Sequence, residues 1–182
     1  MYSGCNRIAL ESQHHIADAL LLLLEDTPFE QISVTRLCRE AGVSRQTFYT
    51  LFDSREDVVI FQLKSACCCK SRLHSALHSR DGFLFSMADY MVTNRGLLTL
   101  LYQNHLMHCF YDSQYEGFME CSSAGPGLSQ RDQAYMADFL ASALTSCART
   151  YVSRGGQESV DELTHIIRDL MMGICFCSLF PT

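Results

Sequence analysis

A cluster of hydrogen-bonding side chains lies in the N-terminal third of the chain. Arg45, Gln46 and Thr47 are consecutive and carry guanidinium, amide and hydroxyl groups. Such groups read base edges in DNA, and Arg bidentate to guanine is the commonest specific contact. Arg45 is therefore the first candidate for base readout, and Gln46 and Thr47 could add readout of adenine or of a thymine methyl group. The cluster predicts double-stranded DNA as a ligand.

Two short helices joined by a tight turn must hold these side chains. Ser33 and Ser44 have hydroxyls that can cap helix N-termini, and Gly42 stands where a helix usually ends on a residue with positive φ. Phe48 and Phe52 lie four residues apart and can face a common core. This pattern is typical of a helix-turn-helix, whose second helix enters the major groove.

The stretch AGVSRQTFYTLFDSREDVV, residues 41–59, closely resembles the signature of the TetR family of bacterial regulators. The resemblance lies in the AGVS turn, the aromatic pair Phe48–Tyr49 with a later Phe52, and the Ser-Arg-Glu that opens the next helix. It extends over about Ile8 to Val59, roughly a third of the chain. It implies a homodimeric transcriptional regulator, most often a repressor, that a small-molecule effector releases from its operator.

The resemblance also assigns Tyr49 and Thr50 mainly to phosphates and nearby bases. Asp53 stands where the family usually has Lys, so Arg55 is the expected substitute for that charge. Helix N-termini favour phosphate through their backbone N–H groups. Ser33, Thr35 and Ser44 stand at such N-termini and therefore join the candidate phosphate contacts. The predicted DNA-binding set is Ser33, Thr35, Ser44, Arg45, Gln46, Thr47, Tyr49, Thr50 and Arg55.

Composition and charge indicate a folded globular protein that is selective rather than strongly basic. The 182 residues are 48% hydrophobic and 19% charged, as in ordinary globular proteins. The net charge is −6, which argues against coating nucleic acid through bulk charge. Residues 33–55 hold four Arg against one Glu and one Asp, a local excess of two positive charges. With no secretory signal and no apolar run long enough for a bilayer, we expect a cytoplasmic protein without a membrane partner.

Apolar spacing and capping signals predict an all-α fold of about nine helices. A three-helix DNA-binding head, residues 1–53, is followed by a helical effector-binding and dimerisation domain, residues 54–182. The expected helices are 8–25, 33–41, 44–52, 54 to about 78, 83–92, 97–110, 111–121, 129–154 and 159–180. A break is expected at Asp81-Gly82, and a loop at residues 122–127.

The last two predicted helices carry more apolar surface than one small bundle needs. One interpretation is that all of it is buried within the protomer. The other, which the family resemblance implies, is a homodimer in which residues of about 129–180 pair with their symmetry mates in a four-helix bundle. Two recognition helices about 34–36 Å apart could then read successive major grooves of a palindromic site.

An effector pocket is expected among the middle helices, where the family resemblance places one. The candidate lining residues are aromatic, although aromatic residues at helical spacing are also ordinary packing residues. The sequence does not identify the ligand. The predicted pocket set is Phe83, Tyr90, Tyr102, Phe110 and Phe118.

Other chemistry is weaker in this sequence. No Ser/His/Asp arrangement, phosphate loop or HExxH motif is present, so neither catalytic residues nor a cofactor are predicted. The His74/His78 pair could chelate a metal, and the run Cys67–Cys69 could sense oxidants, but surface histidines and reduced core thiols are the simpler interpretations. A metal- or thiol-sensing regulator, or a helical interaction or coactivator protein that does not bind DNA, therefore stays as an alternative.

Overall fold

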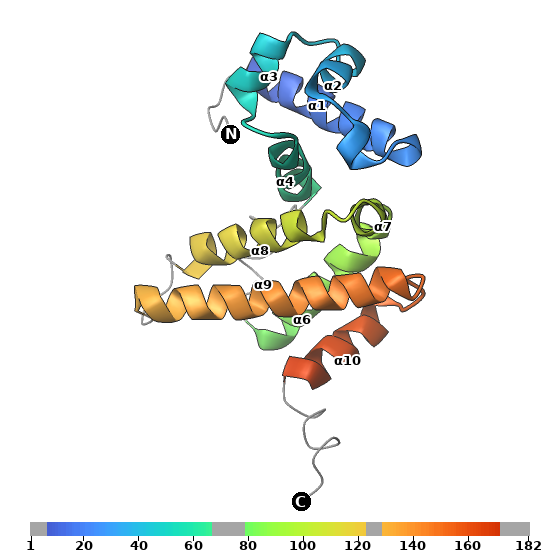
Figure 1. The fold of residues 1–182 in the computed structure, drawn as a ribbon. Coiled ribbons are helices and arrows are strands. Elements are labelled where there is room, and N and C mark those ends of the chain that lie inside the picture. Colours follow the sequence, from blue (N-terminus) through green and yellow to red (C-terminus); the bar gives the residue numbers. More distant parts are fainter. Residues whose placement is uncertain (1–6, 67–78, 123–128, 172–182) are drawn as a thin grey trace, which may run out of the picture.

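The computed structural model describes residues 7–66, 79–122 and 129–171, and the chain in these ranges is entirely helical (Figure 1). The described residues contain nine α-helices and one short 3-10 helix, and no strand. This confirms the predicted fold class. The elements are α1 Arg7–Asp26, η1 Phe29–Gln31, α2 Val34–Glu40, α3 Arg45–Leu51, α4 Arg55–Ala66, α6 Arg80–Thr93, α7 Arg95–Gln103, α8 Met107–Ser122, α9 Gln130–Ser153 and α10 Val160–Met171.

The predicted caps define the helix-turn-helix. The Ser33 hydroxyl oxygen accepts the Arg36 backbone N–H at 3.2 Å, and the Ser44 hydroxyl oxygen accepts the Thr47 N–H at 3.0 Å. Between the two helices Gly42 has a φ of 65°, a conformation that L-residues with a Cβ rarely adopt. Local sequence signals therefore set the angle between α2 and α3.

Two glycines in different conformations give a stability prediction with opposite signs. Gly42 and Gly117 both have open space where a Cβ would stand. Because Gly42 has positive φ, Gly42→Ala is expected to destabilise the chain by about 1 kcal/mol. Gly117 lies inside α8, so Gly117→Ala is expected to stabilise by about 0.5–1 kcal/mol. Urea unfolding of both variants tests this, and a loss of stability in each would contradict the account of Gly117.

Helix α4 lies between the head and the bundle (Figure 1). It packs against α1 on one side and against α8 on the other. In the bundle α8 packs along α9, α7 also contacts α9, and α6 packs against α10. The helix-turn-helix head is therefore attached to the bundle mainly through α4.

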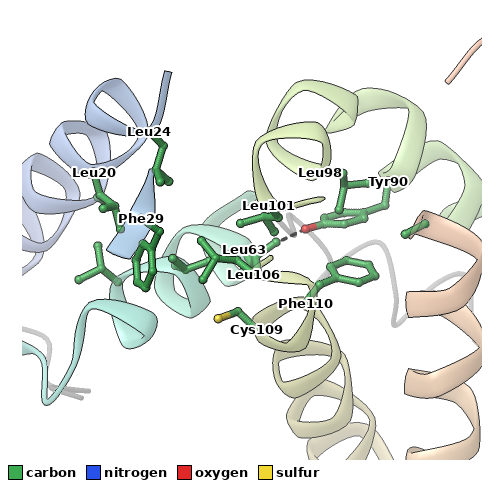
Figure 2. Packing of buried hydrophobic residues seen from close by; sticks show 14 of the residues in the cluster. Leu20, Leu24, Phe29, Leu63, Tyr90, Leu98, Leu101, Leu106, Cys109 and Phe110 are labelled. Carbon is green, nitrogen blue, oxygen red and sulfur yellow. Dashed lines mark hydrogen bonds between the residues drawn. The ribbon is translucent and has the colours of Figure 1, made fainter. Parts of the chain in front are cut away.

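The hydrophobic core is continuous across this attachment. Figure 2 shows buried side chains of the head close to Leu63 of α4, with bundle side chains beyond it. The Tyr90 hydroxyl donates to the Leu63 carbonyl at 3.4 Å, which adds a polar tie to the apolar contacts. Buried residues that follow this path are Leu20, Leu24, Phe29, Leu63, Leu101, Leu106, Cys109 and Phe110.

The single helix predicted over residues 97–110 is wrong. Helix α7 ends at Gln103 and α8 begins at Met107, so the predicted short helix 111–121 is part of α8. At the corner His105 has a φ of 58°, and the Leu106 N–H donates back to the Leu101 carbonyl at 2.8 Å. Leu106 is buried. The apolar spacing favours a helix that continues through the corner. Burial of Leu106 and its hydrogen bond to Leu101 favour a turn instead, and they determine the structure.

Two smaller predictions in the middle of the chain are also corrected. Asp81-Gly82 does not break a helix, because α6 begins at Arg80 and Ser79 caps it by accepting the Gly82 N–H at 3.0 Å. On α4 the residues that trace one side by their spacing are Val58, Phe61, Lys64, Cys68 and Arg72, whereas the buried residues are Val58, Val59 and Leu63. Cys68, Arg72 and the predicted extension toward residue 78 lie outside the described residues.

Serine caps begin the last two helices. The Ser129 hydroxyl accepts the Asp132 N–H at 3.2 Å, and the Ser159 N–H donates to the Glu162 carboxylate at 2.8 Å. Gly155 and Gly156 have positive φ just after α9. The predicted loop 122–127 begins one residue too early, because Ser122 is the last residue of α8. Residues 123–127 and the predicted end of the last helix beyond residue 171 are outside the described ranges. Within those ranges, none of the helices has the length and apolar character to cross a membrane.

Candidate nucleic-acid interface

Helix α3 has one buried face and one exposed polar edge. Phe48 and Leu51 are buried, and Phe48 is 0% exposed. Arg45, Gln46 and Tyr49 are exposed on the opposite side. In the described part of the chain, no protein group hydrogen-bonds the Arg45 or Gln46 side chain, so both present their donors to the surroundings. The ring of Tyr49 packs edge-on against Phe48, with 5.3 Å between centroids.

The hydroxyls of α3 and its cap are used within the helix. Ser44 and Thr47 are joined side chain to side chain at 2.8 Å, and the Thr50 hydroxyl donates to the Gln46 carbonyl at 2.9 Å. These bonds fix the three hydroxyls while leaving oxygen lone pairs that can accept. The groups that can donate to base edges with full capacity are therefore those of Arg45, Gln46 and Tyr49.

A hollow of about 320 Å³ lies beside this edge, between α3 and the first turns of α1. The predicted residues Ser44, Gln46, Thr47 and Thr50 line one side of it. The other side of the hollow is formed by α1, which the sequence prediction missed. The α1 residues lie some 35 positions before α3, and no local pattern in the sequence indicates that the two segments meet. The lining residues from α1 are Ile8, Ala9 and Ser12.

The four arginines of residues 33–55 divide into two pairs. Arg36 donates to the Thr27 hydroxyl at 3.1 Å, and Arg55 donates to the Phe29 carbonyl at 2.8 Å and also to the Ile32 carbonyl. Arg39 and Arg45 are exposed. The Arg55 guanidinium is thus placed inside the head rather than toward a phosphate, unlike the predicted use. The exposed positive charge of the helix-turn-helix lies on Arg39 and Arg45.

Two further predicted contact residues lie at the start of α2. Ser33 and Thr35 are exposed. The Ser33 hydroxyl is the α2 cap, so its neighbouring backbone N–H groups define an exposed helix N-terminus. Such a terminus favours negative charge.

The predicted effector aromatics pack against one another in the bundle. Tyr90 stacks on Phe110 with 6.1 Å between ring centroids, and Phe83 lies 6.0 Å from Phe118. Tyr90, Phe110 and Phe118 are buried, and Tyr102 is exposed. A second hollow, of about 480 Å³, is lined by other residues at the α6–α7 and α9–α10 turns, including Arg95, Tyr151 and Glu158. Neither hollow is lined by a member of the predicted pocket set.

Cysteines in the described ranges are free thiols in or near the core. Cys38 and Cys109 are buried, and Cys147 is half-buried. Burial, together with nearby Glu56 and Asp112, raises the pKa of Cys109 to about 12. Burial also raises the pKa of Cys38 and Cys147. These sulfurs stay protonated near neutral pH, which fits the predicted core role and not a reactive one.

No metal-binding group of His, Cys, Asp and Glu occurs among the described residues. His105, His108 and Cys109, which lie close together in the sequence, therefore form no such group. The candidates His74/His78 and Cys67–Cys69 lie outside the described ranges.

An apolar surface remains exposed on the last two helices. The inward side of α9 is buried along Ala137, Ala141 and Leu144, while Phe139 on another side is 65% exposed. Helix α10 buries Leu163 and Ile167 and exposes neighbours one turn apart. The exposed large apolar residues of the two helices, which we call together the α9/α10 face, are Tyr135, Met136, Phe139, Ile166 and Leu170.

Comparison with known proteins agrees with the geometry. Residues 16–60 match the family model described as bacterial regulatory proteins of the tetR family. No curated protein matches the chain. This segment runs from the second half of α1 through the first half of α4, and it contains the whole helix-turn-helix.

Solved structures share the fold over nearly the whole chain. Lin0861 from Listeria innocua is 18% identical with a TM-score of 0.79, covering 96% of each chain. The dihydroxyacetone kinase operon activator DhaS is 21% identical with a TM-score of 0.52, covering 94% of this chain and 98% of its own. NalD, the secondary repressor of the MexAB-OprM multidrug efflux pump in Pseudomonas aeruginosa, is 16% identical with a TM-score of 0.55, covering 92% and 96%. At these identities the likeness establishes the fold.

Proposed function

We propose that this chain, which belongs to the TetR family of bacterial regulators, binds a palindromic operator as a homodimer through α3. The observation that carries the proposal is the two-sided character of α3. Phe48 anchors it in the core, while Arg45, Gln46 and Tyr49 stand exposed at its outer edge. Side chains of these types make the commonest contacts to base edges and phosphates.

The proposed contact set follows the exposed groups. Base readout falls to Arg45 and Gln46, and Tyr49 contacts phosphate or a nearby base. Arg55 is left out because its guanidinium is bonded inside the head. Ser33, Thr35, Ser44, Thr47 and Thr50 complete the set at the helix N-termini and along α3.

The homodimer is proposed through the α9/α10 face. Large apolar side chains are exposed on both helices, Tyr135 and Phe139 on α9 and Ile166 and Leu170 on α10. Surfaces of this kind in helical proteins are usually covered by another chain. A two-fold axis through the face would present two α3 helices to one duplex, as a palindrome requires.

Repression is the proposed mode of regulation. A protein that occupies operator DNA can block transcription without any further contact, whereas activation needs another surface for the transcription machinery. The same fold is found in a protein described as an activator, DhaS, and in one described as a repressor, NalD. A promoter fusion with and without the chain tests the sign.

Release by a small-molecule effector completes the proposal. The proposed region is the aromatic set of α6, α7 and α8, in which Phe83 is half-buried and Tyr102 is exposed. The stacked pair Tyr90–Phe110 and the tilted pair Phe83–Phe118 must separate to admit a ligand. That change would reach α4 through α8, which packs on it. Compounds that lower operator occupancy would identify the ligand class.

Selection from a random duplex library is the first test of DNA binding. We expect the chain to enrich a palindromic sequence. On that DNA Arg45→Ala is expected to weaken binding by about 1–3 kcal/mol, because one bidentate base contact is lost. Discrimination should relax at one base position in each half-site. A mobility-shift titration on cognate DNA and on each single-base variant measures both effects.

Arg154→Ala serves as the matched control. Arg154 is also exposed but follows α9, outside the head, so its removal should leave operator affinity within twofold or so. If Arg45→Ala lowered the affinity for cognate and for scrambled DNA equally, Arg45 would contact phosphate and not a base. Failure of the wild-type chain to enrich any sequence would favour the alternative of a protein-binding head.

A further inference from the structure

The segment between α1 and α2 is hydrogen-bonded by side chains from two places far along the chain, Arg55 of α4 and Asn104 after α7. The Phe29 backbone N–H donates to the Asn104 side-chain oxygen at 3.0 Å, in a buried position. The Phe29 carbonyl accepts from Arg55 at 2.8 Å, and the Arg55 guanidinium carbon lies 4.4 Å from the Phe29 ring centroid. We call this contact the Phe29 joint, made of Phe29, Arg55 and Asn104. It ties the head both to α4 and to the α7–α8 corner.

Asn104 is held in a single orientation at that corner. Its amide nitrogen donates to the Leu100 carbonyl at 3.0 Å, so its oxygen faces the Phe29 N–H. It is followed by the left-handed His105 and by the buried Leu106. The corner therefore presents one fixed acceptor to the head.

The hydrogen bonds of the Phe29 joint are directional, whereas the apolar contacts around them are not. Figure 2 shows the Phe29 side chain directed toward α4, among buried side chains that include Leu63. Apolar contacts resist separation of two bodies but are non-directional and tolerate sliding. A hydrogen bond requires both distance and angle, so it restricts rotation of one body on the other. The restrained segment leads directly into α2 and α3.

We infer that Asn104 is a positioning residue, which sets the angle of the helix-turn-helix head on the bundle and thereby the half-site separation that a dimer accepts. This inference rests on the proposed function, because it concerns how two α3 helices meet one duplex. Affinity of a single head for a single half-site does not depend on that angle. The spacing between half-sites does.

Asn94 provides a matched control. Both residues end a helix, and both donate their side-chain amide to the carbonyl four residues earlier, Asn94 to Tyr90 at 2.9 Å. Only Asn104 also has the Phe29 N–H as a hydrogen-bond partner among the bonds of the described residues. Asn104→Ala therefore removes a cap and the acceptor for the Phe29 N–H, whereas Asn94→Ala removes a cap alone. Asn104→Asp keeps an acceptor for Phe29 and loses the bond to Leu100.

The experiment measures binding to DNA with altered half-site separation. The selected operator, versions lengthened or shortened by one or two base pairs, and an isolated half-site are titrated with each variant. We expect Asn104→Ala to lose most of the spacing preference, with cognate affinity reduced about tenfold and half-site affinity unchanged. Asn94→Ala should keep the wild-type profile, and Asn104→Asp should recover part of it. An unchanged spacing profile in Asn104→Ala, or equal changes in both alanine variants, overturns the inference.

Amide hydrogen exchange at Phe29 gives a readout that does not depend on DNA. Loss of the acceptor in Asn104→Ala should speed Phe29 exchange by about tenfold, with no change in Asn94→Ala. Unchanged exchange overturns the joint even if wild-type DNA binding is specific. A wild-type chain that selects no sequence instead overturns the proposed function, and with it the DNA-positioning role, whatever the exchange result.

Discussion

Replacing Phe139 with Glu is expected to leave the protomer folded and to prevent two copies from pairing. The Phe139 side chain is 65% exposed on α9, so the substitution removes little packing within the protomer. In the proposed dimer the same side chain is covered, and an unpaired carboxylate there is costly to desolvate. A cost of about 3 kcal/mol would raise the dimer dissociation constant on the order of 100-fold.

Loss of the dimer should carry over to operator binding. A single head reads only one half-site, so affinity for the full palindrome is expected to fall on the order of 100-fold as well. Sedimentation equilibrium measures the assembly state, and a mobility-shift titration measures the affinity. Circular dichroism melting confirms that the protomer still folds.

Leu22→Glu tests whether the effect belongs to the α9/α10 face. Leu22 is 56% exposed, but it belongs to α1, and α1 lies in the head (Figure 1). The same chemical change there should leave the assembly state unaltered. A Phe139→Glu variant that remains dimeric and binds the operator would remove the α9/α10 face from the proposal.

The head could be predicted from the sequence because its determinants are local. Ser33 and Ser44 cap the helices that follow them, and Gly42 has the positive φ that the turn requires. Phe48 and Phe52 are buried as their spacing predicted. Each of these signals acts over three or four residues, a range that a single sequence displays directly.

The α7–α8 corner could not be predicted because tertiary contacts determine it. Neither Gly nor Pro marks residues 104–106, and the apolar spacing continues through Leu106. The corner depends on burial of Leu106 and on the bond from Phe29 to Asn104, which joins residues 75 apart. His105 adopts positive φ, although nothing in the sequence around residue 105 marks it for that conformation.

Arg55 illustrates the same difficulty within the candidate site. Its position after the helix-turn-helix suggested a phosphate contact, and its residue type is right for one. In the fold its partners are the Phe29 and Ile32 carbonyls, 26 and 23 residues earlier in the chain. Residue type indicates what a side chain can bind, while the folded chain determines which partner is within reach.

Phe48→Ala is expected to give the largest loss of stability among the head residues. The ring is 0% exposed, and its centroid lies 5.9 Å from that of Phe52 and 5.3 Å from that of Tyr49. Truncating a buried Phe costs about 3–5 kcal/mol through lost transfer energy and the cavity left behind. For a chain of this size that corresponds to a fall in Tm of roughly 6–20 °C. Calorimetry measures the shift.

The same experiment separates architecture from recognition on one helix. Tyr49→Phe removes a single hydroxyl from a side chain that is 52% exposed, so stability should change by less than about 0.5 kcal/mol. Operator affinity should still fall by about 0.5–1.5 kcal/mol, the usual net value of one hydrogen bond. Phe48→Ala at a temperature where it remains folded should retain the base preferences of the wild type. A Tyr49→Phe variant that lowered Tm as far as Phe48→Ala does, and that kept wild-type DNA affinity, would contradict this account. Tyr49 would then stabilise the core and would not contact DNA.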